Sequence, residues 1–370
     1  MKIALLSYST KPRGGVVHTL ALAEALAALG EDVTVWTLGR GGDAGFFRPV
    51  HPAVRLQIVP FPDGPPAETV GERILRSIAT LRTAFDPTPY DVVHAQDCIS
   101  ANAAGRCVRT VHHLDHFTTP ELAACHERAI VEPYAHVCVS GAVAGELAAG
   151  WGIEAQVIPN GVAYDRFAAT DPAAQASWRS RLGPYILTVG GIEPRKGSLD
   201  LLEAYALLRA ARPDVRLVIA GGETLFDYRD YRADWEARVA ELAVEPVVLG
   251  QVDEDELPSL VAAADAFAFP SLQEGFGLAA MEALAAGVPL VVRDLPVLRE
   301  VFGAAAQFAA TPQDLATDLA HALATEDPAR AAAGRALAAR HTWDAAARSH
   351  LDFYRSLNSS PVNNPCAQGR

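Results

Sequence analysis

Short apolar runs of strand length alternate with longer helical segments along most of this 370-residue chain. The first run spans residues 2–7, and an Ala- and Leu-rich segment, 18–29, follows it. Parallel strands need a long crossover, usually a helix, so this alternation predicts βαβ units with helices on both faces of a parallel sheet. The same pattern predicts strands at 32–38, 54–60, 91–95, 109–112, 136–140 and 156–159, and helices at 68–85 and 142–149.

The alternation restarts after residues 168–183, which are rich in Ala, Asp, Pro and Ser and have no strand pattern. One hydrophobic core rarely serves more than about 250–300 residues, so we expect two α/β domains of similar size, 1–168 and 169–341. The Ser-, Asn- and Pro-rich end, 358–370, predicts a disordered tail. In the second domain the expected strands are 185–189, 215–220, 247–249, 266–269 and 290–292, and the first expected helix is 198–211.

Charge and cysteine usage exclude several classes of protein. The formal net charge of −13 argues against a nucleic-acid-binding protein, because that binding depends on cationic groups that displace counterions. A small anionic ligand stays compatible with this charge. The N-terminus lacks the long apolar core of a signal peptide, and no run reaches the roughly 18 apolar residues of a membrane-spanning helix. Five scattered cysteines without CxxC pairs are typical of reduced thiols, so we expect a cytoplasmic protein without a zinc site.

Two expected strand-to-helix loops combine glycines with cations. The loop after the first strand holds Gly14 and Gly15, and the corresponding loop of the second domain holds Gly191, Arg195 and Lys196. Open α/β sheets bind ligands at the carboxyl ends of their strands, where glycines let the backbone approach and cations pair with phosphate oxygens. Each loop is also compatible with a tight turn or a solvated surface. The first loop lacks the GxGxxG spacing, so a nicotinamide dehydrogenase is not expected.

A third segment, 270–289, runs from a strand end through a Gly-Phe-Gly loop into a helix. Glu274 precedes that helix and Glu282 lies about one turn inside it, so we expect both carboxylates to face one cleft. They can accept hydrogen bonds from ligand hydroxyls, while backbone N–H groups at 276–278 meet a phosphate. Glutamates at helix starts also complement the helix dipole, so this pair is a weak signal by itself.

Together and in this order, the three segments resemble the retaining glycosyltransferases of family 4, whose E-x7-E motif matches Glu274 and Glu282. The resemblance extends along nearly the whole chain and includes Asp-Val-Val-His at 91–94 and Pro-Asn-Gly-Val at 159–162. It implies the GT-B fold, in which two Rossmann-like, doubly wound parallel-sheet domains face each other across a cleft. It also implies that an acceptor binds mainly to the first domain and a nucleotide-sugar donor, most often linked to UDP, mainly to the second.

The same resemblance implies a last helix, 342–357, that packs back on the first domain. We expect Trp343 and Tyr354 in this helix to be packing residues. Carried onto this sequence, the family pattern has Arg195 and Lys196 neutralise the departing diphosphate, so that no metal or other cofactor is needed. Transfer then retains the anomeric configuration by a front-face route, in which the leaving phosphate oxygen helps to deprotonate the acceptor.

The resemblance also assigns the remaining site residues. Thr-Val-His-His at 110–113 departs from the family's Thr-x-His-Asp pattern, so it leaves open whether His112 or His113 contacts the sugar. In the family pattern Glu274 holds hydroxyls of the transferred sugar and Glu282 holds those of ribose. The implied catalytic set is His112, Arg195, Lys196 and Glu274, and the implied donor-binding set is Gly14, Gly15, Gly191, Phe276, Gly277, Leu278 and Glu282.

Other functions stay open on the sequence alone. A nucleotide-sugar epimerase or a phosphorylase has the same fold and a different reaction, and a non-catalytic sugar- or nucleotide-binding protein has the site without the chemistry. The acceptor is not identified by these residues. Arg73, Arg76 and Arg82 in the helix expected at 68–85 are compatible with membrane association, but the acidic chain favours a soluble acceptor.

Overall fold

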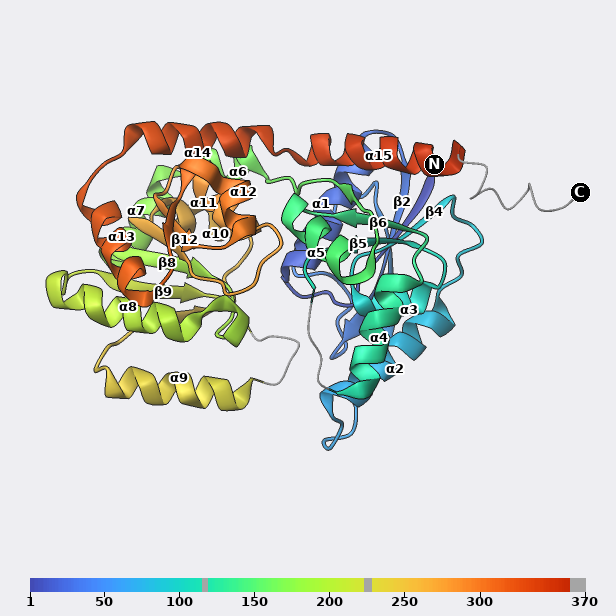
Figure 1. Ribbon diagram of the computed structural model, residues 1–370, viewed down its shortest axis with the longest axis horizontal. Helices are drawn as coiled ribbons and strands as arrows, with labels where there is room; N and C mark the ends of the chain where they lie inside the picture. The colour runs from blue at the N-terminus through green and yellow to red at the C-terminus, as the bar shows by residue number, and fades with distance from the viewer. Residues whose placement is uncertain (115–118, 223–227, 360–370) are drawn as a thin grey trace, which may run out of the picture. The chain divides into compact units, whose positions relative to one another are not determined.

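The chain forms two compact units, seen in a computed structural model (Figure 1). Met1–Gly161 and the C-terminal segment from Trp343 make up the first unit, and Val162–Thr342 makes up the second. The chain thus leaves the first unit before the boundary at 168/169 that the sequence predicted, and it returns at the predicted last helix. The structure describes residues 1–114, 119–222 and 228–359.

The sheet of the first unit is parallel throughout, and in the described residues its strand order is β3-β2-β1-β4-β5-β6-β7. Leu5 of β1 lies beside Val35 of β2 and His94 of β4. The order reverses between β1 and β4, so their carboxyl ends form the position at which open α/β sheets bind ligands. Every strand predicted for this half is present with small shifts at its ends: β1 Lys2–Leu6, β2 Asp32–Arg40, β3 Arg55–Phe61, β4 Val92–Ala95, β5 Val108–Val111, β6 Ala135–Cys138 and β7 Gln156–Val157.

Alternate residues of β1 bury against different helices. Ile3 and Leu5 join the core formed with the first and last helices of the unit, whereas Ala4 and Leu6 join the core on the other face. A strand buried on both faces reads as a continuous apolar run, which is why the sequence predicted it correctly. The helices of this unit are α1 Gly14–Ala28, α2 Val70–Ala84, α3 Cys98–Ala104, α4 Pro120–Val131, α5 Gly141–Trp151 and α15 Trp343–Ser359.

The start of α1 differs from the prediction. Gly14 and Gly15 are the first residues of the helix, not part of a loop that ends before residue 18, and Arg13 is its N-cap. Glycine is a poor helix former, but burial of Val16, Leu20 and other apolar residues on the core face outweighs that cost. The pair therefore opens a helix N-terminus.

The C-terminal helix α15 packs along α1 in the first unit (Figure 1). Tyr354 is fully buried, as predicted for a packing residue, and its hydroxyl lies 2.6 Å from Nδ1 of His94. The hydroxyl of Thr110 lies 2.7 Å from Nε2 of the same histidine, so both ring nitrogens are satisfied. Because α15 continues to Ser359, the first residues of the predicted tail are helical, and 360–370 lie outside the described residues.

The sheet of the second unit repeats this design with the order β10-β9-β8-β11-β12-β13 among the described residues. The order reverses between β8 and β11, which places a second ligand-binding position at their carboxyl ends. The prediction missed β13, whose brief run is not long enough to be read as a buried strand. The bounds are β8 Tyr185–Val189, β9 Arg216–Ala220, β10 Val247–Gly250, β11 Ala266–Phe269, β12 Leu290–Arg293 and β13 Gln307–Ala309.

Helices fill the stretch 168–183, where the sequence predicted no strand. Asp171 caps the second of them with Pro172 in its first turn, a combination typical of helix starts. The first, α6, packs against α10 and α11, which explains why 162–168 belong to the second unit. The helices are α6 Tyr164–Ala168, α7 Pro172–Leu182, α8 Ser198–Ala211, α9 Arg229–Glu241, α10 Leu257–Ala262, α11 Leu278–Ala285, α12 Pro296–Phe302, α13 Pro312–Ala324 and α14 Pro328–Arg340, with 3₁₀ turns at Pro194–Lys196 and Gly303–Ala305.

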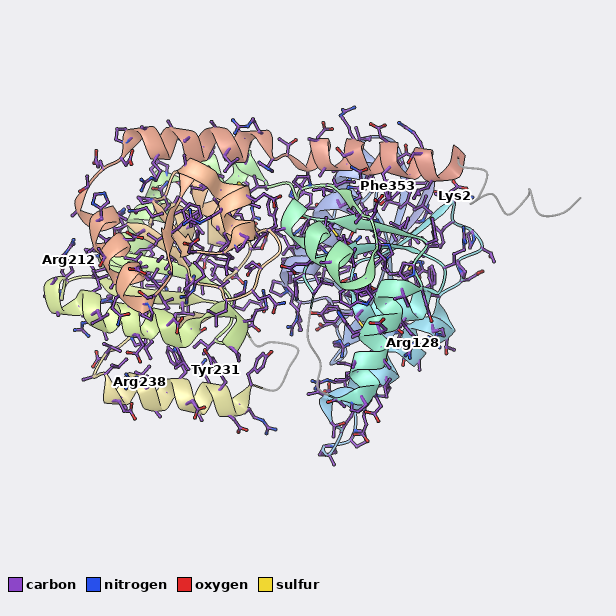
Figure 2. All side chains as sticks on the ribbon, in the orientation of Figure 1. Lys2, Arg128, Arg212, Tyr231, Arg238 and Phe353 are labelled. Atoms are coloured by element: carbon purple, nitrogen blue, oxygen red, sulfur yellow. The ribbon has the colours of Figure 1, made fainter. Side chains whose placement is uncertain are left out.

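Two polar contacts attach α9 to α8 at the edge of the second unit (Figure 2). The Tyr231 hydroxyl accepts a hydrogen bond from the backbone N–H of Leu199 at 3.3 Å. Arg238 Nε donates to Glu203 Oε1 at 2.5 Å. Among the described residues, no helix has both the length and the hydropathy needed to cross a membrane.

Two close backbone contacts hold the loop after β8 in place. A Cβ on Gly197 would lie 2.2 Å from the carbonyl oxygen of Pro270, and one on Gly221 would lie 2.1 Å from that of Gly190. Gly197 also has φ of +64°, which side chains rarely adopt. Only glycine allows the loop after β8 to approach the end of β11 this closely.

Gly197→Ala is therefore expected to destabilise the second unit by about 2–4 kcal/mol, because the clash adds to the cost of a positive φ. Gly152→Ala is the matched control, since Gly152 has φ of +66° and no atom within 4 Å of the added Cβ. The control should lose only about 1 kcal/mol. Urea unfolding followed by tryptophan fluorescence measures both losses, and equal losses would contradict the close contact.

Candidate active site

Arg195, Lys196 and Glu274 form one charged cluster at the carboxyl edge of the second sheet. Arg195 NH1 lies 3.2 Å from Glu274 Oε1, and Lys196 Nζ forms an ion pair with the same oxygen. The backbone joins the two loops as well, because Leu272 N–H donates to the carbonyl of Arg195 at 2.8 Å. Three of the four predicted catalytic residues are thus in direct contact.

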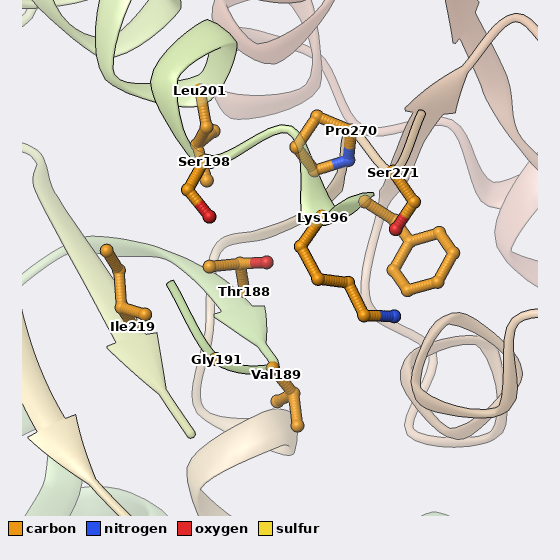
Figure 3. Close-up of a pocket in the computed structure, with 11 residues that line it drawn as sticks. Thr188, Val189, Gly191, Lys196, Ser198, Leu201, Ile219, Pro270 and Ser271 are labelled. Atoms are coloured by element: carbon orange, nitrogen blue, oxygen red, sulfur yellow. The ribbon is translucent and has the colours of Figure 1, made fainter. Parts of the chain in front are cut away.

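A pocket lies beside this cluster, between the ends of β8 and β11 (Figure 3). Lys196 extends into it between Val189 and Ser271 and its Nζ lies 5.0 Å from the centre of the Phe269 ring. The predicted residue Gly191 also lines the pocket. In the described part of the chain, the buried hydroxyl of Ser271 has no hydrogen-bond partner. The pocket thus offers a ligand the Lys196 ammonium group and a Ser271 hydroxyl that is available for a hydrogen bond.

Partial burial of Lys196 strengthens the attraction between its ammonium group and an anion. Its side chain is only 20% exposed, and burial lowers the pKa of its ammonium group, an effect that the Glu274 carboxylate opposes. Ionic interactions are stronger in such a partly desolvated position than in water. A ligand anion that enters here therefore gains more from Lys196 than from a surface lysine.

A buried arginine supports the loop that carries Glu274. Arg293 Nε donates to the Pro270 carbonyl at 3.3 Å and its NH1 donates to the Ala310 carbonyl at 2.9 Å. Its other nitrogen forms an ion pair with Asp200 in the first turn of α8. These contacts tie the end of β11 to the helix that follows the Arg195–Lys196 turn. Sequence reasoning missed Arg293 because its position at a strand end carries no motif.

The helix α11 starts in the Gly-Phe-Gly loop, as the sequence predicted. Gly277 is its N-cap with φ of +95°, and the N–H groups from Leu278 onward open the helix. Phe276 as a whole residue is 3% exposed, and its ring centre lies 5.7 Å from that of His341. Its side chain is therefore a packing group of the second unit.

Glu282 lies inside α11 and has an unusual carboxyl group. Burial raises its pKa to about 8, and the nearby Glu254 carboxylate adds to this effect, while Arg166 opposes it. Arg166 itself pairs with Glu254. Glu282 is thus protonated at neutral pH, so its carboxyl can both donate and accept a hydrogen bond.

In the first unit, His112 lies beside the N-terminus of α1. It follows β5, and a Cβ on Gly15 would lie 3.8 Å from Cδ2 and Nε2 of its ring. The structure therefore brings together the predicted residues Gly15 and His112. His113 follows along the chain, and the choice between the two histidines as a sugar contact stays a prediction. Residues 115–118, which follow shortly after, lie outside the described residues.

His112 belongs to a group of four histidines, with His18, His94 and His350. The ring centres of His18 and His112 are 4.8 Å apart, and those of His94 and His350 are 5.7 Å apart. Burial is the main cause that lowers the pKa of all four, to about 4 in His350. All four rings are therefore neutral at pH 7. His18 and His350 could not be singled out from the sequence, because each lies in a helix without a motif.

Two family models match successive parts of the chain. The model described as Glycosyltransferase Family 4 matches residues 12–166, and the model described as Glycosyl transferases group 1 matches residues 175–337. A phosphatidyl-myo-inositol mannosyltransferase from Mycolicibacterium smegmatis is 31% identical over 350 residues, covering 87% of this chain and 84% of that protein. This chain belongs to glycosyltransferase family 4.

Other similarities agree with this. A D-inositol 3-phosphate glycosyltransferase from Xylanimonas cellulosilytica is 29% identical over 405 residues, covering 95% of this chain and 96% of that protein. The solved sucrose-phosphate synthase from Thermosynechococcus elongatus has a TM-score of 0.78 at 21% identity and covers 96% of this chain and 99% of its own. Anabaena HepE in complex with UDP and glucose has a TM-score of 0.72 at 21% identity, covering 97% of this chain and 100% of its own. The predicted GT-B type of fold is confirmed.

The predicted site residues of this family 4 glycosyltransferase divide between its two units. Gly14, Gly15 and His112 lie in the first, within the part that the Glycosyltransferase Family 4 model matches. The others lie in the second, within the part that the group 1 model matches. In the described residues, no group of three or more His, Cys, Asp or Glu side chains is arranged to hold a metal ion.

Acid is expected to weaken the first unit of the glycosyltransferase below about pH 6.5, through the group of His18, His94, His112 and His350. Each folded pKa lies below the unfolded value, so between the two values only the unfolded chain holds the proton. The stabilisation is therefore complete at neutral pH and is lost as the pH falls. His350 by itself accounts for up to about 3 kcal/mol near pH 4.

Thermal unfolding of the wild type and of His350→Gln across this range measures the effect. The variant should lose less stability on acidification than the wild type, because glutamine does not titrate. Parallel pH profiles for the two proteins would contradict the pKa of about 4 for His350.

Proposed function

We propose that this glycosyltransferase transfers a sugar from a nucleotide-sugar donor to an acceptor hydroxyl, with retention of configuration and without a metal ion. The observation that carries this proposal is the contact of Arg195 and Lys196 with Glu274 at the carboxyl edge between β8 and β11. A diphosphate placed there meets two cations, and a sugar beside it meets a carboxylate. The UDP complex of the similar HepE fold supports a nucleotide at this type of site.

The two cations suit a leaving diphosphate for different reasons. Arg195 presents a planar group that can bond two oxygens, and Lys196 presents a point charge in a partly desolvated pocket. As the bond from the sugar carbon to the phosphate breaks, negative charge grows on the diphosphate, and the cations stabilise it most in the transition state. This is the work that a divalent cation does in other phosphate sites, which is why we propose a metal-independent reaction.

The proposed step keeps the incoming and outgoing groups on one face of the sugar. The bond between the anomeric carbon and the phosphate oxygen breaks, and a bond to the acceptor oxygen forms. The acceptor proton passes to the departing phosphate oxygen. Glu274 holds hydroxyls of the sugar, and the protonated Glu282 shares hydrogen bonds with the ribose hydroxyls. His112, neutral through burial, can donate to or accept from a sugar hydroxyl.

The donor and acceptor chemistry is proposed from the relatives. UDP is the proposed nucleotide, as for HepE, and the relatives named mannosyltransferases favour mannose among the sugars to be tested. Relatives named for phosphatidyl-myo-inositol and D-inositol 3-phosphate favour an acceptor that is a phosphate-bearing polyol. We also place the reaction in the cytoplasm, since the cysteine usage is typical of reduced thiols.

Removing a cation and removing the carboxylate from the cluster of Arg195, Lys196 and Glu274 should have opposite effects on UDP binding. UDP should raise the melting temperature of the wild type equally with and without EDTA, and saturation at about 100 times the dissociation constant corresponds to about 2.7 kcal/mol. Lys196→Ala should abolish most of this shift. Glu274→Gln should keep or increase the shift, because it removes a carboxylate that competes with phosphate, while sugar transfer falls at least about 100-fold.

Arg212→Ala is the control, because Arg212 forms an exposed ion pair with Asp214, and such pairs contribute little to stability. It should behave as the wild type does. GDP, ADP and dTDP in the same experiment test the choice of base. A folded Lys196→Ala protein that keeps the full UDP-induced rise in melting temperature would overturn the proposed role of Lys196. A rise that EDTA removes would overturn binding without a metal ion.

A further inference from the structure

His18 has contacts that connect three separate parts of the first unit. It lies in α1, is 1% exposed, and its Nδ1 is 2.9 Å from Asn160 Oδ1. Its ring centre lies 4.8 Å from that of His112 and 5.3 Å from that of Trp343, in edge-to-face arrangements. The predicted sugar contact His112 therefore packs against a residue that no motif identified.

Two of these partners lie where the chain passes between the units. Asn160 lies two positions before Val162, the first residue of the second unit, and Trp343 is the first residue after the chain returns. The two crossings are themselves paired, since Val162 N–H donates to the His341 carbonyl at 2.8 Å. His18 thus contacts the end of one crossing segment and the start of the other.

We infer that His18 is a positioning residue for transfer, which holds the His112 ring in one orientation by bracing it against Asn160 and Trp343. This inference rests on the proposed function, because it assumes that His112 contacts a reacting sugar. His18 itself does not touch the substrate in this arrangement. Its role is to keep a neighbouring ring fixed.

The hydrogen bond to Asn160 sets the state of the His18 ring. An amide oxygen only accepts, so His18 Nδ1 carries the hydrogen and Nε2 carries a lone pair. Within the described residues, Nε2 of His18 and Nε2 of His112 are both buried without a hydrogen-bond partner. Such buried polar atoms are costly, and they are common where a ligand supplies the missing bond. His112 Nε2 faces Gly15 at the start of α1, which is where a substrate hydroxyl can supply it.

Packing alone does not explain this arrangement. A leucine or phenylalanine at position 18 would fill the core without a hydrogen bond to Asn160. The other histidines of the group have different hydrogen-bond partners. His350 Nδ1 donates to the Ala346 carbonyl within its own helix, at 2.8 Å. His18 instead bonds Asn160, a side chain beside the crossing, and presents its ring to His112. The His18–Asn160 bond therefore links the ring beside His112 to the crossing, whereas the hydrogen bond of His350 stays within α15.

Four full-length variants test this role. His18→Leu removes the bond to Asn160, Asn160→Ala removes it from the other side, and His18→Asn keeps a side-chain N–H near the position of Nδ1. His350→Gln is the control for the loss of a buried histidine from the same cluster. UDP-glucose and GDP-mannose serve as donors, and release of UDP or GDP is the measure of turnover.

The expected result is a fall in kcat of at least tenfold for His18→Leu and Asn160→Ala, with the donor KM and the UDP-induced thermal shift unchanged within twofold. His18→Asn should recover much of the loss, the two losses should not add in the double variant, and His350→Gln should keep the wild-type kcat. A folded His18→Leu protein with the wild-type kcat would overturn the inference.

Histidine ¹⁵N NMR of the full chain gives a readout that does not depend on turnover. His18 should show the Nδ1–H tautomer, and His112 should show one ring state in the wild type but a mixture in His18→Leu. The Nε2–H tautomer at His18, or an unchanged His112 signal, would overturn the positioning role. Failure of the proposed function looks different: neither donor is turned over and UDP gives no thermal shift, or His112→Ala keeps full turnover.

Discussion

The ion pair between Lys196 and Glu274 joins the two loops on which the proposed donor site depends. One partner follows β8 and the other follows β11, the two strands at which the order of the second sheet reverses. Opposite charges in a mostly buried position hold the loops together without a ligand, and they do so beside a pocket. The fold thus brings the carboxyl ends of β8 and β11 together, and the ion pair places a cation and a carboxylate there.

Close backbone packing makes the ion pair achievable. A Cβ on Gly197 would lie 2.2 Å from the carbonyl oxygen of Pro270, and Arg293 Nε donates to the same oxygen at 3.3 Å. A larger residue at 197 would collide with Pro270, so we expect it to disturb the contact between the Arg195–Lys196 turn and Glu274. The site is therefore held by groups that take no part in chemistry, and its geometry follows from the core beneath it.

The candidate site of the first unit includes a group of neutral histidines, whereas that of the second unit contains a charged cluster. The group of His18, His94, His112 and His350 is neutral and connects α1, β4, the end of β5 and α15. Desolvation lowers their pKa values, so that His112 is available as a neutral hydrogen-bonding group at pH 7. Such a cluster is stable only because the hydroxyls of Tyr354 and Thr110 and the amide of Asn160 satisfy several of its nitrogens.

Much of the fold could be predicted from the sequence, because strands buried on both faces leave continuous apolar runs such as 2–7 and 185–189. The helices α3 and α4 and the strand β13 were missed, and α3 and β13, with seven and three residues, are too short to show a clear period. The cluster of Arg195, Lys196 and Glu274 was predictable because its residues lie in loops after strands, where the edge of a parallel sheet brings them together.

The rest of the candidate site depends on contacts between distant parts of the chain. His18 and Asn160 are 142 positions apart, and His94 and Tyr354 are 260 positions apart. No local sequence pattern therefore predicts either contact. Arg293 likewise acquires its role only when β12 lies beside β11. The raised pKa of Glu282 also needed the structure, because it depends on burial and on Glu254.

The stereochemistry of sugar transfer tests the central proposal most directly. The donor that gives the largest thermal shift would be incubated with the enzyme, and the anomeric ¹H signal of the first product would be followed by NMR in real time. Transfer beside the leaving diphosphate predicts a product with the anomeric configuration of the donor. A product that first appears with the inverted configuration would contradict it.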